Sequence, residues 1–231
     1  MISNYLQNTK NCHDEKYREL GISFQRKHAN EDVIRFFYKH KLKGKKILDI
    51  GCGSGRNSIF LLNENCNVVA LDFSSQGINV FNKRISNKKI KKLKLLVDSM
   101  PYLKKVKGTF DSVIDCFSSY CLTKTDFKIY LGNIKKKLKK NGIYHLQIFS
   151  KNSDIYKNFK PSKKIGNSIL TQKRKSSPFF GDEYLFSFYS KIELIKLLQN
   201  FFKISSFEIF TRTYRNTSEH LEYFVVECKK K

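Results

Sequence analysis

The stretch from Lys46 to Leu62 constrains this chain more than any other part of it. The apolar run from Ile47 to Ile50 is typical of a short buried strand, and the apolar residues after the last glycine favour a helix. Three glycines at alternate positions separate the two. Because glycine has no Cβ, the backbone can turn tightly there and a ligand can lie against bare peptide. The start of a helix adds unpaired N–H donors. The stretch therefore predicts a ligand-binding turn between a strand and a helix.

The spacing of the glycines and of one later carboxylate indicates a nucleoside ligand. Dinucleotide-binding turns have the pattern Gly-x-Gly-x-x-Gly, whereas Gly51, Gly53 and Gly55 give Gly-x-Gly-x-Gly. The next predicted strand, residues 67–72, ends in Asp72, which follows Gly51 by 21 residues. A carboxylate at that place can accept hydrogen bonds from both hydroxyls of a ribose. An NAD-dependent oxidoreductase is disfavoured because the third glycine comes one residue early.

Asp49, the three glycines, Asp72 and Asp98 together resemble the motifs of the class I S-adenosylmethionine (SAM)-dependent methyltransferases. In that family the glycine turn cradles the methionine part of SAM, a carboxylate after the second strand binds the ribose, and one after the third strand binds the adenine amine. The resemblance implies these roles for the glycines, Asp72 and Asp98. It makes SAM the expected cofactor and S-adenosyl-L-homocysteine the expected product, and it is clearest over residues 46–149.

The resemblance also implies further cofactor contacts. Asp49 is expected to orient the glycine turn by accepting backbone N–H bonds. Arg56 departs from the small residue common at its position, and Gly55-Arg56-Asn57-Ser58 resembles the tellurite-resistance and related small-molecule methyltransferases. Arg26 lies in a segment that resembles one reaching the methionine end of the cofactor, where it would pair with the carboxylate; a solvated basic turn is the alternative. The other expected contacts are Phe73, Ser99, Met100 and Cys116.

Hydrophobic periodicity predicts a single α/β domain over residues 1–231. The expected fold is a Rossmann-like, seven-stranded, mostly parallel sheet flanked by helices, with the last strand antiparallel as the family resemblance implies. Residues 1–45 would form an N-terminal flap of one or two short helices and a helix before the first strand, and residues 46–149 the cofactor-binding core. Residues 150–189 lack clear periodicity and predict a hairpin or lid over the substrate pocket. Residues 190–231 would complete the sheet.

Two details of this prediction concern the ends of elements. A helix opened by Thr123 and Asp126 is expected to stop at Asn141-Gly142, which is a typical C-terminal signal. The polar residues 211–220 are expected to form a loop between the last two strands, residues 202–210 and 221–228.

Composition narrows the class of protein and its partners. The chain carries a formal charge of +25, but 37 of its 45 basic residues are lysine, a bias that compositional drift explains better than nucleic-acid binding. Attraction of an acidic small substrate is a second explanation. Six scattered cysteines without zinc-ligand spacing predict reduced thiols, no metal site and a cytoplasmic protein. No signal peptide or membrane span is expected, and the expected assembly is a monomer or homodimer.

Candidate catalytic and substrate residues lie outside the cofactor motifs. Methyl transfer from a sulfonium needs alignment of the reactants, and needs a base only if the acceptor is protonated. The candidates near the expected pocket are Tyr120 at the end of strand four, His145 in strand five, and His220. Core packing is the alternative for Tyr120, and a hydrogen-bonded structural histidine is the alternative for His145. His220 lies in the expected polar loop. Tyr189, Arg212 and Arg215 are candidate substrate contacts, because arginine forks suit carboxylate or phosphate.

The sequence thus favours SAM-dependent methyl transfer to an oxygen or nitrogen of a small, acidic acceptor such as a sugar or phosphorylated metabolite. The Asn-Pro-Pro-aromatic signature of many nucleic-acid amino-methyltransferases is absent after strand four, where Asp115 to Ser118 stand instead. An RNA methyltransferase and a non-catalytic SAM-binding subunit remain the alternatives.

Overall fold

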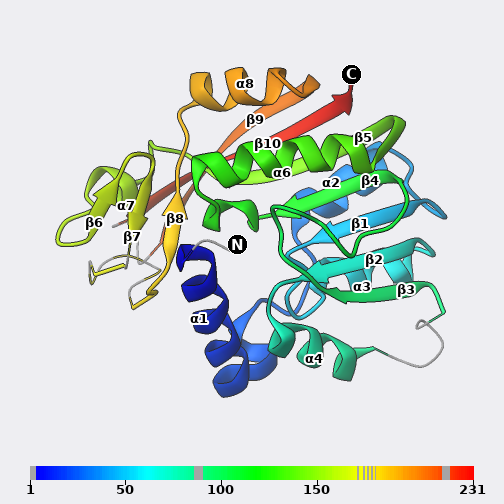
Figure 1. Cartoon of the computed structure of the whole chain (residues 1–231), viewed down its shortest axis with the longest axis horizontal. Helices are drawn as coiled ribbons and strands as arrows, with labels where there is room; N and C mark the ends of the chain where they lie inside the picture. Colours follow the sequence, from blue (N-terminus) through cyan, green and yellow to red (C-terminus); the bar gives the residue numbers. More distant parts are fainter. Residues whose placement is uncertain are drawn as a thin grey trace.

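The computed structural model of the protein describes residues 4–85, 91–170, 172, 173, 175, 177, 179, 181–214 and 219–231. Its main sheet has seven strands in the order β3-β2-β1-β4-β5-β10-β9 (Figure 1). The strands are β1 Lys46–Ile50, β2 Asn67–Asp72, β3 Leu93–Val97, β4 Phe110–Cys116, β5 Leu138–Phe149, β9 Phe202–Tyr214 and β10 Glu219–Lys230. β10 is antiparallel to both of its neighbours, β5 and β9, and the other pairs of neighbouring strands are parallel. The predicted Rossmann-like sheet with an antiparallel last strand is confirmed.

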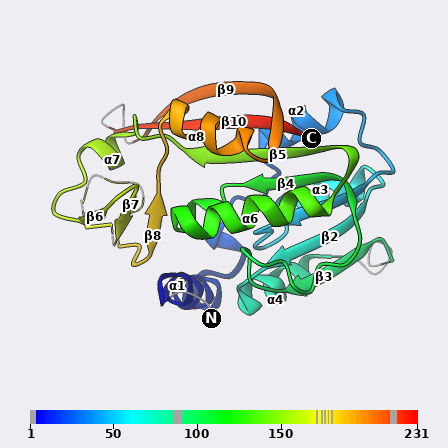
Figure 2. The ribbon, with the colours of Figure 1, turned by 45° about the horizontal axis from the view of Figure 1, so that its top comes forward.

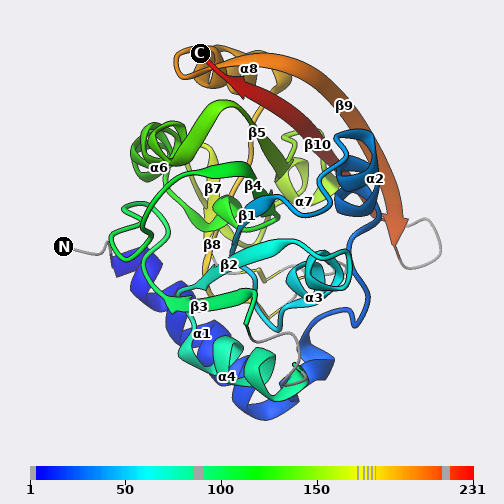
Figure 3. The ribbon, with the colours of Figure 1, turned by 90° about the vertical axis from the view of Figure 1, so that its right-hand side faces the viewer.

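Helices cover both faces of this sheet (Figure 3). One face is packed by α2 (Glu31–Lys39), α3 (Arg56–Asn63) and α4 (Ser75–Arg84), and the other by α6 (Lys124–Lys137) and α8 (Lys191–Gln199). The central strands are apolar on both sides: Ile47, Leu48 and Ile50 of β1 have no exposed surface. Such strands need helices on both faces to exclude water, which explains the three-layer arrangement.

The N-terminal segment forms one long helix, α1 (Asn4–Leu20), followed by a 3-10 turn (Gly21–Phe24). The sequence predicted shorter helices because the buried positions of α1 include polar Thr9 and Asp14, which weaken its hydrophobic pattern. α1 packs against α4 and against β8 (Leu185–Ser187). The Asn30 side chain caps the start of α2, since it accepts the backbone N–H of Asp32.

The insertion after β5 contains α7 (Asp154–Lys157) and a second, three-stranded antiparallel sheet. Its strands are β6 (Lys163–Ile165), β7 (Ser168–Leu170) and β8. Figure 2 shows this small sheet beyond the carboxyl ends of the parallel strands, with α1 beside it. The insertion and α1 therefore stand over the edge of the sheet where α/β proteins bind their ligands.

Two predicted element ends were wrong. α6 stops at Lys137, and β5 begins at Leu138, because Leu138 is buried and pairs with Phe110. Asn141, which has a φ of +65°, then lies in an irregularity of this strand rather than at a helix end.

The polar residues after residue 210 continue the sheet instead of forming a loop as far as 220. Arg212 pairs with Leu221 and Thr213 with His220 in the β9–β10 ladder. Alternating burial of Leu221 and Tyr223 fixes this register. Arg215 lies outside the described residues. In the described part of the chain, no helix has the length and apolar character needed to cross a membrane.

Candidate functional site

The glycine turn between β1 and α3 closes against side chains from distant parts of the chain. Gly53 has a φ of +52°, and a Cβ there would come within 2.3 Å of the Tyr17 hydroxyl oxygen and 2.4 Å of the Gln25 amide. A Cβ on Gly51 (φ +65°) would come 2.1 Å from Ser118 Oγ. Both the backbone conformation and the close approach therefore require glycine.

Gln25, which lies outside the sheet, forms hydrogen bonds with the same turn. Its Oε1 accepts the backbone N–H and the hydroxyl of Ser54, each at 3.1 Å. Arg84 of α4 donates to the Ser54 carbonyl at 2.6 Å. The turn is thus pre-organised by Gln25 and Arg84, and its shape does not depend on glycine alone.

Asp72 ends β2 beneath this turn with a buried carboxylate. Its Oδ2 accepts the N–H of Gly53 at 2.8 Å, and its Oδ1 accepts the N–H of Ser74 at 2.8 Å. Burial raises the pKa of Asp72 to about 6, against the hydrogen bonds from Ser74 and Gly53, while the charge of Asp14 raises it further. Each oxygen keeps a lone pair, so the group can still accept bonds from a diol.

Among the described residues, the hydrogen bond of the Asp49 side chain goes to α3 and not to the amides of the glycine turn. Its Oδ2 accepts the hydroxyl of Ser58 at 2.5 Å, which joins β1 to the first turn of α3. Burial raises the pKa of Asp49 to about 7, opposed by the Ser58 bond and by the charge of Arg56. Asp49 therefore positions the helix that follows the turn rather than the turn's own amides.

Asp98 and Ser99 line a cavity of about 470 Å³ at the end of β3. Phe73 and Tyr102 provide aromatic walls, and α1 closes the cavity with Leu6. Asp98 accepts the backbone N–H groups of Ser99 at 2.8 Å and of Lys105 at 2.7 Å, so its carboxylate also shapes the following loop. An apolar slot beside a carboxylate suits a flat base with an exocyclic amine.

A second cavity, of about 360 Å³, connects the turn with α1 and the insertion. Gly51, Asp72, Phe73 and Met100 line it from the sheet side. The other walls come from α1, from the segments after α1 and β4, and from the insertion: His13, Lys16, Tyr17, Phe24, Gln25, Phe117, Ser118, Tyr120, Cys121, Phe179, Asp182 and Tyr184. We call this the turn cavity.

A third cavity, of about 270 Å³, adjoins it and shares Gln25, Gly51, Phe117, Tyr120 and Phe179 as walls. We call this the arginine cavity, because it collects three of the expected residues from distant positions: Arg26, Arg56 and Arg212. The expected Cys116 lines it as well. The rest of the lining includes the rings of Phe149 and Tyr223 and the polar side chains of Asn30 and Asn57.

The arginines of this cavity differ in their partners. Arg212 donates from Nε to the Tyr223 hydroxyl at 3.2 Å and forms an ion pair with Glu31. Arg56 Nη2 lies 3.6 Å from Cys116 Sγ. Burial raises the pKa of the Cys116 thiol to about 12, so it stays protonated beside the guanidinium. The cavity therefore combines guanidinium groups, one of them paired with Glu31, with aromatic and polar walls.

The remaining expected residues lie elsewhere. His145 is fully buried under α2, with its ring 4.7 Å from that of Phe36, and burial lowers its pKa to about 3. His220 is exposed on β10, where its Nδ1 lies 3.2 Å from Asp154. Tyr189 is buried against Phe127, and its hydroxyl has no hydrogen-bond partner among the described residues. None of the three is a wall of the turn cavity or the arginine cavity within the part of the chain that the structure describes.

Several residues of the site were not anticipated from the sequence. Tyr17 and Gln25 pack closely against the glycine turn. Asp182 and Tyr184 of the insertion line the turn cavity. His13 and Tyr17 stand four residues apart on one face of α1, which is a usable signal. Asp182 and Tyr184 carry no such local pattern.

The match to a known family covers most of the residues described above. A family model described as a methyltransferase domain matches residues 41–193. Among curated proteins, the ubiquinone biosynthesis O-methyltransferase of Pelagibacter ubique is 30% identical over 137 residues, which are 56% of this chain and 54% of that protein. The chain thus spans about half the length of this relative.

Solved structures share the fold. A SAM-dependent methyltransferase from Methanosarcina mazei superposes with a TM-score of 0.71 at 21% identity, over 88% of this chain and 98% of that one. The 1,6-didemethyltoxoflavin-N1-methyltransferase of Burkholderia thailandensis, solved with S-adenosylhomocysteine, gives a TM-score of 0.69 at 16% identity, over 98% and 88% of the two chains.

Proposed function

Because the chain belongs to the methyltransferase domain family, we propose that it transfers the methyl group of SAM to an oxygen or nitrogen of a small acceptor with an anionic group. The family match confirms the family expected from the glycine turn and supports SAM as the cofactor. The observation that carries the choice of acceptor is the arginine cavity, which opens beside the glycine turn and shares walls with the turn cavity.

The cofactor would lie along the carboxyl ends of β1, β2 and β3. Asp72 offers its free lone pairs to the ribose hydroxyls, and the cavity between Phe73 and Asp98 takes the adenine. The methionine part lies on the glycine turn, with Arg26 near its carboxylate. Asp72, Asp98 and the glycine turn are already held by hydrogen bonds, and Phe73 is held by packing, so little ordering of these groups is needed when SAM binds.

The acceptor would occupy the arginine cavity. Arg212 is held by its hydrogen bond to Tyr223 and its ion pair with Glu31. Its guanidinium group lines the cavity together with the rings of Tyr223 and Phe149. A carboxylate or phosphate on the acceptor pairs with this guanidinium, while the apolar body of the acceptor displaces water from the rings. The Pelagibacter relative is named for O-methylation and the Burkholderia protein for N-methylation, which supports either atom as the nucleophile.

The chain's contribution to the reaction is alignment and exclusion of water. The sulfonium supplies the electrophilic methyl group, and the displacement needs the nucleophile in line and in contact with it. The walls shared by the two cavities are the place for this contact. Their aromatic members, Phe117, Tyr120 and Phe179, keep water from competing as the acceptor.

Calorimetric titration tests the cofactor assignment. SAM and S-adenosylhomocysteine should bind the wild type, NAD should not, and Asp72→Ala should weaken binding by at least about tenfold, because the ribose loses a charged acceptor. Binding of NAD alone would overturn the assignment.

An acceptor screen tests the arginine cavity. Methyl transfer from labelled SAM is measured with 3,4-dihydroxybenzoate, 4-aminobenzoate, glucose 6-phosphate and phosphoethanolamine. Arg212→Gln should raise KM for the accepted compound by about tenfold or more, since a charged hydrogen bond is lost, and leave SAM affinity unchanged. Arg18→Gln, on the exposed face of α1, is the matched control. An equal KM in Arg212→Gln would exclude Arg212 from acceptor binding.

A further inference from the structure

A chain of hydrogen bonds leads from the wall between the two cavities into the insertion. Tyr120 Oη lies 3.3 Å from Tyr184 Oη, and Tyr184 donates to Asp182 Oδ2 at 3.0 Å. Asp182 Oδ1 accepts Lys16 Nζ of α1. Three parts of the sequence, α1, the turn after β4 and the insertion, therefore meet in one network.

The hydroxyl protons of this hydrogen-bonded chain can point in only one direction. A carboxylate is an acceptor, so the Tyr184 proton points to Asp182. The Tyr184 oxygen then accepts the hydrogen bond of the Tyr120 hydroxyl. The Tyr120 oxygen keeps a lone pair that can accept a hydrogen bond from a bound molecule. Burial raises the pKa of the Tyr120 and Tyr184 phenols, which stay protonated at neutral pH. The negative charge of the network therefore resides on Asp182.

The hydroxyl group of Tyr120 is the open end of this hydrogen-bonded network, at the wall between the two cavities. Tyr120 is a wall of both the turn cavity and the arginine cavity and is half-buried, whereas Tyr184 and Asp182 are only 5% and 6% exposed. The Tyr184 ring is held 4.8 Å from Phe186 and 4.7 Å from His13. Packing thus fixes the Tyr184 ring and excludes water from its hydrogen bonds.

We propose that Tyr120, Tyr184 and Asp182 form a proton relay that removes the proton of a hydroxyl acceptor during methyl transfer. This inference rests on the proposed function and narrows it, because it assigns the nucleophile as an O–H group rather than an amine free base. Tyr120 is the residue that touches the acceptor, and Tyr184 and Asp182 act through it.

The step balances in atoms and charge. The acceptor oxygen forms a bond to the methyl carbon while the bond from carbon to sulfur breaks, and the electron pair of that bond stays on sulfur as a neutral thioether. The acceptor proton passes to Tyr120 oxygen, the Tyr120 proton to Tyr184, and the Tyr184 proton to Asp182. One positive charge on sulfonium and one negative charge on Asp182 are thereby removed together, and Lys16 stays protonated.

The test compares two acceptors that differ in acidity. 3,4-Dihydroxybenzoate carries protonated phenols at pH 7.5, whereas its 5-nitro derivative is ionised and needs no base. With the first, Tyr184→Phe and Asp182→Asn should each lower kcat about 100-fold, the usual size of a general-base effect. With the nitro derivative the loss should largely disappear. Tyr156→Phe, in α7 of the same insertion, is the matched control and should behave as wild type with both.

The ratio of the two rates separates a relay from a purely structural role, because a loosened insertion would slow both acceptors alike. Equal losses with both acceptors, or no loss with either, would overturn the relay while leaving the proposed function intact. Methylation of 4-aminobenzoate but of neither phenol would overturn it as well. Absence of SAM binding in the wild type would instead count against the proposed function itself.

Discussion

At the scale of single residues, burial decides the charge of the site. Asp72 is 5% exposed beneath the glycine turn, and its pKa of about 6 places its titration close to physiological pH. The sequence predicts a carboxylate at this position but not its proton affinity, because the burial comes from neighbours brought in by the fold. Asp14 of α1, which lies 58 positions earlier, is one of them.

Cofactor affinity should follow the titration of Asp72. A protonated carboxyl accepts weaker hydrogen bonds than a carboxylate, so the ribose loses binding energy below the pKa. With a pKa of about 6, the Kd of S-adenosylhomocysteine should rise about tenfold between pH 7 and pH 5. Calorimetry over this range measures it, and Asp72→Asn should abolish the dependence. A flat profile in the wild type would contradict the role given to Asp72.

His145 should make the fold less stable in acid. Burial holds its pKa at about 3, while the unfolded chain takes up the proton near 6.5. The unfolded state then binds more protons between these values, so the free energy of unfolding falls as pH drops through this window. His145→Gln should remove about 2 kcal/mol of the loss between pH 7 and pH 5. Urea unfolding at both pH values tests this, and an identical loss in the variant would refute it.

At the scale of elements, the glycine turn illustrates what a local pattern can predict. The strand, the turn and the helix α3 follow from residues within one short stretch, and the structure has all three. The length of α1 was not predicted, because polar Thr9 and Asp14 occupy two of its buried positions. The continuation of β9 was not predicted, because exposed Thr211 and Thr213 give no apolar alternation. Tertiary contacts override weak local signals of this kind.

The start of α3 offers a test of this packing. Gly55 has a φ of +84°, and a Cβ there would come 2.2 Å from the Phe81 ring of α4. Gly166 has a φ of +56° with nothing near its Cβ position, so it carries the same kind of backbone strain without the clash. Gly55→Ala should lose about 1–3 kcal/mol more stability than Gly166→Ala in urea unfolding. Equal losses would show that the contact with α4 yields freely.

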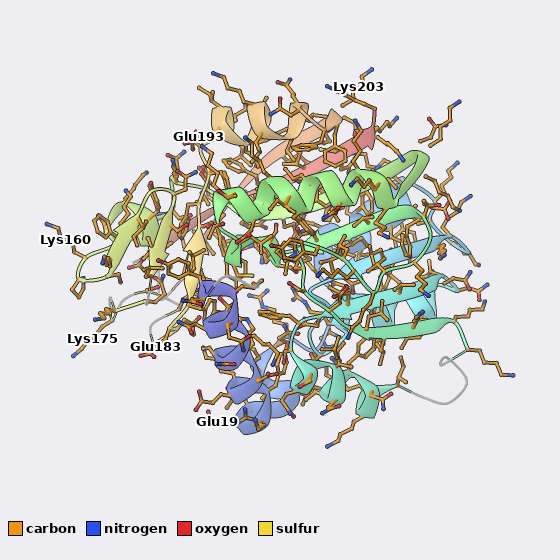
Figure 4. All side chains as sticks on the ribbon, viewed as in Figure 1. Glu19, Lys160, Lys175, Glu183, Glu193 and Lys203 are labelled. Carbon is orange, nitrogen blue, oxygen red and sulfur yellow. The ribbon has the colours of Figure 1, made fainter. Side chains whose placement is uncertain are left out.

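At the scale of the whole molecule, charge is the dominant feature. Figure 4 shows labelled side chains such as Lys160 and Lys203 extending from the periphery of the protein. With a formal charge of +25, repulsion among surface lysines opposes the compact state.

Added salt should therefore stabilise the protein. Screening weakens repulsion between exposed charges, and the Debye length falls from about 10 Å at 0.1 M to about 3 Å at 1 M salt. The thermal midpoint should rise between 0.05 M and 0.5 M sodium chloride. A fall would mean that ion pairs such as Arg35 with Glu208 outweigh the net charge.

The sequence by itself determined the sheet, the glycine turn and the carboxylates that follow the strands. Each of these depends on periodicity and spacing along a continuous stretch, so their physics is local. Only the tertiary structure decided the acceptor side. Its walls come from α1, from the ends of β4 and β5, from the insertion and from β9 and β10, and these meet only because the strand order brings their ends together. For that reason one cavity contains Arg26, Arg56 and Arg212. The hydrogen-bonded network of Tyr120, Tyr184 and Asp182 likewise could not be predicted from a local sequence pattern.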